Sequence, residues 1–303
     1  MNTQKKIVGL VGATGNFGRM IAHALVERYG VHVRGLARNP ANEQARALAG
    51  RGVEIVAGNL GDESSLARLV DGAVAIVSAV QGGPSELIEG QLALLRAARN
   101  AGVPRFVPSD YSVDFMKLRQ GENPGADLRR AFAQASEGER GDTRVVHVNV
   151  GAFLDRRVLF GFLGMFDLAQ NKAFVWGEGR EKMDFTTYAD SAIAVAAAAT
   201  LPDVPTWFNV AGDSLNFREL VAATEAGSGR KLTLERRGTL EDLDAEIDAR
   251  RRAEPQNIFA WLPLTYQRAM LSGRGKLDDL VNARIPDFRP AAVEHYARTE
   301  LQS

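Results

Sequence analysis

The chain has 303 residues of ordinary globular composition, 45% of them hydrophobic and 24% charged, so a sizeable buried core is expected. Its 37 basic and 37 acidic residues cancel, which gives no electrostatic reason to expect nucleic acid or an anionic membrane as a partner. There is no cysteine, so disulfides, thiolate catalysis and cysteine-ligated metals are excluded.

The N-terminus is polar and runs directly into an apolar segment that glycines soon interrupt, which is not the shape of a secretory signal. The alanine-rich stretch 192–200 has about half the length that a membrane span needs. We therefore expect a soluble, cytoplasmic protein.

The first part of the chain alternates short apolar runs with helical patterns. The expected strands are residues 7–11, 31–37, 53–57, 73–80 and 105–108. The expected helices are residues 17–29, 41–49, a segment ending at 70, and 86–100. Such alternation indicates a parallel sheet with right-handed crossovers and helices on both faces. The predicted fold class is therefore α/β, with a Rossmann-type doubly wound parallel sheet.

The regular alternation ends after Ser109. Residues 111–126 are expected to form a loop, because glycine and proline interrupt them. Further strands are expected at 144–150 and 206–210, and further helices at 127–137, 217–226, 240–252 and 257–272. We expect residues 1–150 to form a dinucleotide-binding Rossmann domain. Residues 151–303 are expected to form a smaller, mixed substrate-side lobe, with some segments returning to the Rossmann sheet.

A glycine-rich turn, Gly12-Ala13-Thr14-Gly15-Asn16-Phe17-Gly18, lies between the first expected strand and helix. In that context the glycine spacing predicts a turn that binds the pyrophosphate of a dinucleotide. Gly12 permits the tight turn, Gly15 lets the backbone approach the phosphates, and Gly18 lets the helix pack on the strand. The phosphates would meet backbone N–H groups and the positive end of the helix. A turn that serves packing alone is the alternative.

The end of the second strand distinguishes the two nicotinamide cofactors. NAD-binding proteins usually place a carboxylate there, to bond the ribose 2′-hydroxyl. This chain instead has Arg38, whose planar donor fork suits a 2′-phosphate, and Arg46 could assist from the next helix. NADP(H) is therefore the expected cofactor, with a solvated surface arginine as the alternative.

Later strand ends are expected to complete the cofactor site. Asn59 could hydrogen-bond the adenine edge. The small residues Ser78, Ala79 and Val80 leave room for the ribose and nicotinamide, and Ser109 ends the next strand. Ligands in open α/β sheets lie at the carboxyl ends of strands, where all of these residues are expected.

Several motifs resemble the NmrA-like group of atypical short-chain dehydrogenases, which includes the isoflavone and phenylcoumaran benzylic ether reductases. They are the Gly12–Gly18 turn, Arg38-Asn39-Pro40, Arg105-Phe106-Val107-Pro108-Ser109-Asp110-Tyr111, Trp176-Gly177-Glu178-Gly179 and Asp184-Phe185-Thr186-Thr187-Tyr188-Ala189-Asp190. The resemblance implies NADPH binding and hydride delivery to an aromatic or other small carbonyl-like substrate. Reductases of this group carry a lysine at the start of the helix after the Pro-Ser-Glu/Asp segment, whereas residues 124–130 of this chain contain none.

Ordinary short-chain dehydrogenases use a tyrosine followed four residues later by a lysine, whose ammonium lowers the phenol's pKa. None of the five tyrosines here has such a lysine. The best substitute is the loop after Ser109, where Tyr111 could donate a proton to a developing alkoxide and Lys117 could tune it. Alternatively, Tyr111 packs and Lys117 is solvated, while Asp110 and Asp114 hydrogen-bond the backbone of the turn.

Other candidate residues carry less chemistry. His147 is expected to be a buried, hydrogen-bonded histidine, and no histidine or carboxylate spacing indicates a metal site. Phe153, the apolar run 160–166 and Trp176 are expected to form either core or the wall of a pocket, with Phe153 beside the cofactor. Such a wall would suit a flat apolar substrate.

The leading hypothesis is an NADPH-dependent reductase of a small, largely apolar or aromatic carbonyl-type compound. The alternative is a non-catalytic NADP(H) sensor that acts through a protein partner, which the missing Tyr/Lys pair favours. A nucleotide-sugar epimerase or dehydratase is the third hypothesis, although it would normally need that pair.

Overall fold

The computed structural model describes residues 5–302, which divide into two compact units. The first unit runs to Asp110 and also contains Leu128–Val148 and Ser191–Phe208. The second unit contains Tyr111–Asp127, Asn149–Asp190 and the chain from Asn209 onward. Each unit is therefore built from separate stretches of the chain.

A six-stranded parallel sheet forms the centre of the first unit, in the order β3-β2-β1-β4-β5-β6. Its strands are β1 Ile7–Val11, β2 His32–Ala37, β3 Glu54–Ala57, β4 Ala73–Ser78, β5 Arg105–Val107 and β6 Arg144–Val145. This order is that of a Rossmann-type doubly wound sheet, so the predicted α/β fold class is confirmed.

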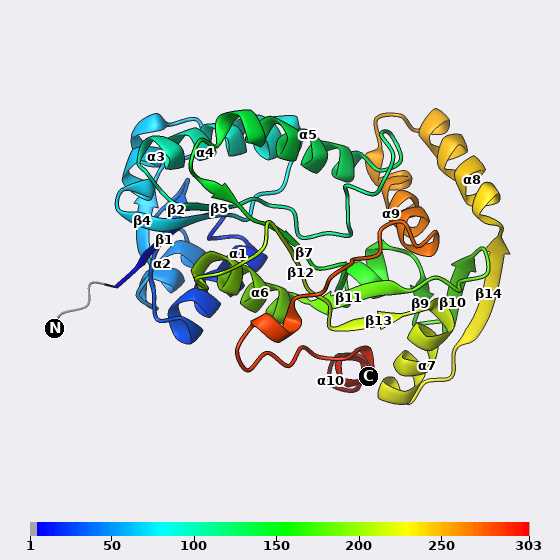
Figure 1. The fold of residues 1–303 in the computed structure, drawn as a ribbon. Coiled ribbons are helices and arrows are strands. Elements are labelled where there is room, and N and C mark those ends of the chain that lie inside the picture. The colour runs from blue at the N-terminus through cyan, green and yellow to red at the C-terminus, as the bar shows by residue number, and fades with distance from the viewer. Residues whose placement is uncertain (1–4, 303) are drawn as a thin grey trace. The chain divides into compact units, whose positions relative to one another are not determined.

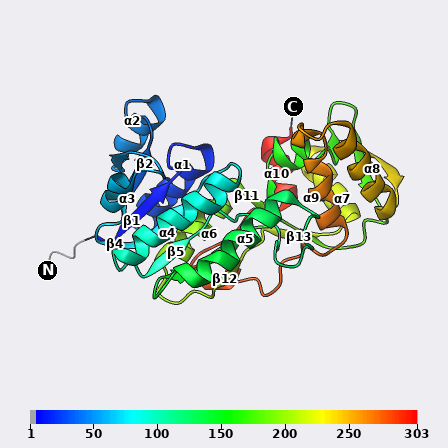
Figure 2. The same cartoon turned by 90° about the horizontal axis from the view of Figure 1, so that it is seen from above.

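Helices cover both faces of this sheet. They are α1 Asn16–His23, α2 Glu43–Ala49, α3 Glu63–Val70, α4 Gln91–Asn100, α5 Pro124–Glu139 and α6 Tyr188–Thr200. Figure 1 shows α3, α4 and α5 on one face of the sheet, with α1 and α6 on the other, and Figure 2 shows the same unit from above. Two π-helical turns, Ala24–Arg28 and Ser85–Gly90, continue α1 and precede α4.

The core of the first unit lies between the sheet and the helices α3, α4 and α5. Phe106 of β5 is fully buried, and its ring centroid lies 6.0 Å from that of Phe132 on α5. Leu94 and Leu95 of α4 and Ile76 of β4 are buried in the same cluster. Burial of each such side chain contributes about 1.5–3 kcal/mol, so this face holds the strand ends rigidly in place.

The predicted strand 144–150 is two short strands, because its hydrogen-bonding partner changes. The N–H of Val146 donates to the carbonyl of Phe106 at 2.8 Å, whereas the next N–H, of His147, donates to the carbonyl of Thr206 at 2.8 Å. The second strand is β7 His147–Asn149, which pairs with β12 Trp207–Asn209.

The second unit contains two three-stranded sheets, in the orders β13-β11-β8 and β14-β10-β9. The strands are β8 Ala152–Leu154, β9 Phe166–Asp167, β10 Lys172–Trp176, β11 Met183–Thr187, β13 Asp213–Leu215 and β14 Thr233–Gly238. The helices are α7 Phe217–Ser228, α8 Leu240–Ala253, α9 Leu262–Leu271 and α10 Val293–Glu300. Shorter helical turns are Val158–Phe162, Ile258–Ala260 and Asn282–Arg284.

The predicted helix 257–272 is interrupted. Trp261 has a φ of −127°, which lies outside the helical region, and α9 begins at the next residue. Pro263 lies in the first turn of α9, where its missing N–H costs nothing. The sequence pattern continues across this break because both pieces are apolar.

Candidate functional site

The glycine-rich turn joins β1 to α1 at the carboxyl edge of the six-stranded sheet. Gly12 has a φ of +76°, and a Cβ there would lie 2.3 Å from the carbonyl oxygen of Ala79. A Cβ on Gly18 would lie 2.0 Å from the carbonyl oxygen of Gly12. Thr14 is half-buried within the turn. Gly12 and Gly18 are therefore required by the close packing of β1, α1 and the end of β4.

Gly15 differs from the other two glycines because packing does not require it. Its φ of −69° and ψ of 163° suit any residue, and an added Cβ would meet only the carbonyl oxygen of Gly12, at 3.2 Å. Gly15 is the N-cap of α1, which has no side-chain cap and no acidic residue in its first turn. Asn16, Phe17 and Gly18 are the first three residues of this helix. The open space and the positive helix end form a cradle that fits the diphosphate of a dinucleotide.

A positive charge that no sequence motif indicates lies next to this cradle. The guanidinium of Arg19 donates to the side-chain oxygen of Asn16 at 3.4 Å. A cation in the first turns of a helix is disfavoured by the helix dipole, so a bound phosphate would improve its environment. Nothing in the local pattern separates this arginine from any other helix-surface arginine.

Two predicted contacts of the cofactor's adenosine end lie beyond β2. Arg38 follows the strand directly and Arg46 lies on α2, and both side chains are exposed. A hydrogen bond with Ser85 holds the pKa of the Glu86 carboxyl below its usual value, and the charge of Arg38 adds weakly to this effect. Arg38 is therefore close enough to this carboxylate to act on it electrostatically.

Asn59, the predicted adenine contact, follows β3 on the same sheet edge. Its side-chain oxygen accepts the N–H of Gly61 at 2.8 Å and so stabilises the turn into α3. The amide nitrogen is the donor of Asn59 that suits an adenine edge.

The ends of β4 and β5 are tied together by Ser109. Its hydroxyl donates to the carbonyl of Val80 at 2.7 Å, and its N–H donates to the side-chain oxygen of Gln91 at 2.8 Å. Ser78 is fully buried, and the N–H of Ala79 donates to the carbonyl of Val11 at 2.9 Å. The residues predicted to face the ribose and nicotinamide thus belong to one connected edge of the sheet. Gln91, buried on α4, was not predicted.

Asp110 and His147 form a buried pair within the first unit. The Nδ1 of His147 lies 2.6 Å from Oδ2 of Asp110, and the two side chains are 3% and 1% exposed. The imidazole stacks on Trp207, with ring centroids 4.4 Å apart. The prediction of a buried, hydrogen-bonded histidine at 147 is confirmed. The carboxylate of Asp110 meets this histidine, rather than the backbone of its own turn as predicted.

Tyr111 begins a loop of the second unit, residues 111–118, which we call the 111–118 loop. Tyr111 is buried and has a φ of +30°, a backbone conformation that non-glycine residues rarely adopt. The carbonyl of Ser112 accepts the N–H groups of Val150 and Gly151, each at 3.1 Å. These contacts hold the start of the loop in one conformation.

Lys117 lies further along the same loop. Its ammonium lies 2.7 Å from the carboxylate of Asp278 and 3.5 Å from that of Asp114, and it donates to the carbonyl of Lys276 at 2.5 Å. An ammonium has three donors, and these acceptors account for all three. Asp114 also accepts the N–H of Met116 at 3.1 Å, as predicted for this turn.

Phe153, the predicted aromatic contact of the cofactor, lies on β8 in the second unit. It is half-buried and stacks on Tyr188, with ring centroids 4.1 Å apart. Burial raises the pKa of the Tyr188 hydroxyl, and the negative charge of Asp155 adds to the effect. The Tyr188 hydroxyl is therefore neutral near pH 7.

The apolar run that follows Phe153 forms core. Phe160 and Phe166 have ring centroids 4.9 Å apart, and Phe166 stacks on Phe217 of α7. Trp176 is also buried, whereas Phe162 is 36% exposed. Of the two alternatives predicted for this run, the structure therefore supports core for Phe160 and Phe166.

Two kinds of feature are absent from the described residues, 5–302. No group of three or more histidine, aspartate or glutamate side chains is arranged to hold a metal ion. No helix in that part of the chain is long and apolar enough to cross a membrane.

The sheet order and the glycine-rich turn define a Rossmann-type α/β protein. Residues 4–135 match the model of the NmrA-like family. The predicted resemblance to the NmrA-like family is therefore confirmed for this part of the chain.

Curated relatives and a solved structure extend this likeness over most of the chain. The "Probable pinoresinol-lariciresinol reductase 3" of Arabidopsis thaliana is 26% identical over 245 residues, which cover 76% of each chain. The "Phenylcoumaran benzylic ether reductase IRL1" of Ginkgo biloba is 27% identical over 75% of this chain and 77% of its own. A structure described as "AtPrR2 with NADP+ and (+)pinoresinol" superposes with a TM-score of 0.79 at 22% identity, covering 98% of this chain and 99% of that one.

Proposed function

We propose that this chain is an NADPH-dependent reductase of a small, largely apolar or aromatic carbonyl-type compound. The observation that carries the proposal is the cradle at Gly15, where open space meets the uncapped N-terminus of α1. The Arabidopsis and Ginkgo relatives, which are named as reductases, and the neighbour described with NADP+ and pinoresinol support it.

The residues proposed to hold the cofactor follow the carboxyl edge of the sheet. The first turn of α1 would bind the diphosphate, and Arg38, with help from Arg46, would bind the 2′-phosphate. The remaining proposed contacts are Thr14, Asn59, Ser78, Ala79, Val80, Ser109 and Phe153. When bound, NADPH supplies the hydride, while the protein orients it and excludes water.

Tyr111 is the residue we propose as proton donor, to the oxygen on which negative charge develops. A phenol hydroxyl is suited to this role, since it is a hydrogen-bond donor that can face the developing charge. Lys117 has its three donors engaged by neighbours in its own unit, so its proposed contribution is to hold the 111–118 loop.

The test is an initial-rate assay of NADPH oxidation by the purified chain with a panel of aromatic aldehydes, ketones and enones. We expect turnover of at least one member, and faster oxidation of NADPH than of NADH. A panel without turnover, in the presence of demonstrated NADPH binding, would contradict the reductase proposal.

One observation favours a second function. Residues 124–130, at the start of α5, contain no lysine, although reductases resembling this chain carry one at this place. A chain that binds NADP(H) without reducing a substrate could act as a redox sensor through a protein partner. NADPH and NADP+ would then bind with clearly different affinities, and no member of the substrate panel would be reduced.

A further inference from the structure

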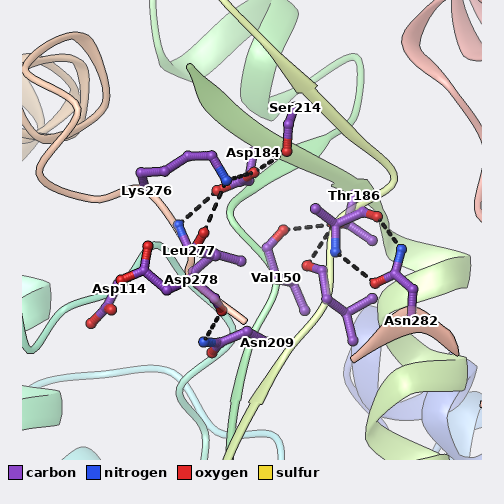
Figure 3. Close-up of polar contacts among 12 residues, drawn as sticks. Asp114, Val150, Asp184, Thr186, Asn209, Ser214, Lys276, Leu277, Asp278 and Asn282 are labelled. Carbon is purple, nitrogen blue, oxygen red and sulfur yellow. Dashed lines mark hydrogen bonds and ion pairs between the residues drawn. The ribbon is translucent and has the colours of Figure 1, made fainter. Parts of the chain in front are cut away.

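The segment that follows α9, residues 273–278, is fastened to β11 by one buried carboxylate, and we call this segment the strap. Asp184 of β11 has a side chain that is only 1% exposed. It accepts hydrogen bonds from the ammonium of Lys276 at 2.7 Å, from the N–H of Leu277 at 2.7 Å and from the hydroxyl of Ser214 (Figure 3). A cation and two further donors thus compensate the burial of this charge.

The strap in turn holds the 111–118 loop through Lys117. The ammonium of Lys117 donates to the carbonyl of Lys276 at 2.5 Å and pairs with Asp278 at 2.7 Å. Lys276 therefore binds Asp184 with its side chain and Lys117 with its backbone. The two contacts lie on the same residue, so movement of Lys276 changes both.

A close backbone approach adds a second link between the strap and the loop. The carbonyl of Gly275 accepts the N–H of Asp114 at 3.0 Å. A Cβ on Gly275 would lie 3.0 Å from the Cβ of Val113, which is tighter than ordinary side-chain contact. Glycine at this position therefore lets the strap lie directly against the loop.

The start of the loop is tied to the same strand by a separate path. The hydroxyl of Thr186 on β11 donates to the carbonyl of Val150 at 2.7 Å (Figure 3). The N–H of Val150 donates to the carbonyl of Ser112 at 3.1 Å. The loop is thus attached to β11 near both of its ends, and Tyr111 immediately precedes the first attachment.

We propose that Lys276 is a positioning residue that acts through the strap to hold Tyr111 in place for proton delivery. Loops are mobile by default, and the φ of +30° at Tyr111 needs surrounding contacts to maintain it. A displacement of about 1 Å in a reacting group can lower a rate by about a hundredfold. The inference rests on the proposed function, in which Tyr111 delivers the proton.

The test compares variants that release the strap with a control that does not. Lys276→Met alone would leave the carboxylate of Asp184 buried and unpaired, so it is combined with Asp184→Asn. Gly275→Ala perturbs the same contact without changing any charge. The matched control is Lys172→Met, which removes an ion pair with Glu235 at 2.7 Å between β10 and β14 of the same unit.

Two readouts separate positioning from a merely structural role. Amide hydrogen exchange of the 111–118 loop should become at least about tenfold faster in the Asp184→Asn/Lys276→Met and Gly275→Ala variants, with α7 and β10 unchanged. The kcat for NADPH oxidation should fall by about tenfold or more, while the KM for NADPH stays within about twofold. Lys276→Arg keeps the donors and should restore most of the kcat.

Three results would overturn the inference. In the first, amide hydrogen exchange of the 111–118 loop equals that of the Lys172→Met control. In the second, amide exchange rises equally throughout the second unit. In the third, the loop exchanges faster but the kcat is unchanged. If the wild-type chain reduces no substrate, the proposed function and this positioning role both fail. Unchanged loop exchange beside normal wild-type turnover refutes the inference alone, so the two failures are distinguishable.

Discussion

Replacement of Gly15 by alanine should weaken cofactor binding while leaving the fold intact, whereas Gly18→Ala should destabilise the fold itself. The added methyl at Gly15 meets only the carbonyl oxygen of Gly12, at 3.2 Å, and projects into the cradle. The added methyl at Gly18 would lie 2.0 Å from the same oxygen. Comparison of the two variants therefore tests which glycine is required by a bound ligand and which by packing of the fold.

The expected magnitudes follow from these contacts. Gly15→Ala gains about 0.4–1 kcal/mol from a less flexible unfolded chain and loses a similar amount because alanine is a poor N-cap, so the net change is small. Each charge-assisted hydrogen bond to a phosphate that the methyl prevents costs about 1.5–3 kcal/mol. At about 1.4 kcal/mol per factor of ten, NADPH should bind at least tenfold more weakly.

The assay combines NADPH fluorescence titration with thermal unfolding of both variants. Gly15→Ala should keep the wild-type Tm within about 4 °C, which corresponds to roughly 1 kcal/mol, and lose affinity. Gly18→Ala should lower the Tm by more than this. Wild-type NADPH affinity in Gly15→Ala would refute the assignment of the cradle.

Three further predictions follow from single side chains. Arg38→Ala should lower the ratio of NADPH to NADH affinity by about tenfold or more, because one charge-assisted contact to the 2′-phosphate is lost. An unchanged affinity ratio in paired titrations would show that Arg38 does not bind the 2′-phosphate. Tyr111→Phe should lower kcat by about a hundredfold or more with the NADPH Kd unchanged; a kcat near the wild-type value would exclude Tyr111 as the donor. A hydrogen bond from His32 holds the pKa of Glu54 below its ordinary value of 4.5, so this carboxylate stabilises the fold above that pH and ceases to do so as the pH falls through its lowered pKa. Glu54→Gln should therefore lower the Tm at pH 7 and converge with the wild type in acid, and a Tm difference independent of pH would contradict this.

The sequence predicts the first unit well because its signals are local. The strands β1, β2, β3, β4 and β5 coincide with the short, mostly apolar runs of the sequence, and Asn42 and Asp62 cap α2 and α3 through their side chains. Asn216 likewise caps α7, close to the predicted start of that helix. In each case the side chain of the residue before the helix accepts a backbone N–H of the first turn, and this hydrogen bond caps the helix.

The strands of the second unit were not predicted, because their positions depend on distant partners. β14, Thr233–Gly238, is largely charged and exposed, and it pairs with β10 some 60 residues earlier in the chain. β11, Met183–Thr187, is buried along its whole length and contains Asp184, whose charge is compensated by Lys276. A buried aspartate in a strand gives no local signal of the lysine that pairs with it.

The residues of the candidate site likewise include some that the local sequence predicts and others that depend on distant partners. The glycines of the turn can be assigned from their spacing, because a strand, a turn and a helix follow one another in the chain. The pairing of Asp110 with His147 and of Lys117 with Asp278 joins residues far apart in sequence. The ion pairs of the Lys117 ammonium with Asp114 and Asp278 can therefore be seen only in the folded chain.

The most direct test of the central claim is transfer of deuterium from NADPH that carries deuterium at both nicotinamide C4 positions into an aromatic carbonyl compound, followed by mass spectrometry of the product. The proposed function predicts one deuterium in the reduced product, and formation of this labelled product about a hundredfold or more slowly by Tyr111→Phe. Tight binding of the labelled cofactor with no label in any product of the panel would contradict the claim that this chain is a reductase.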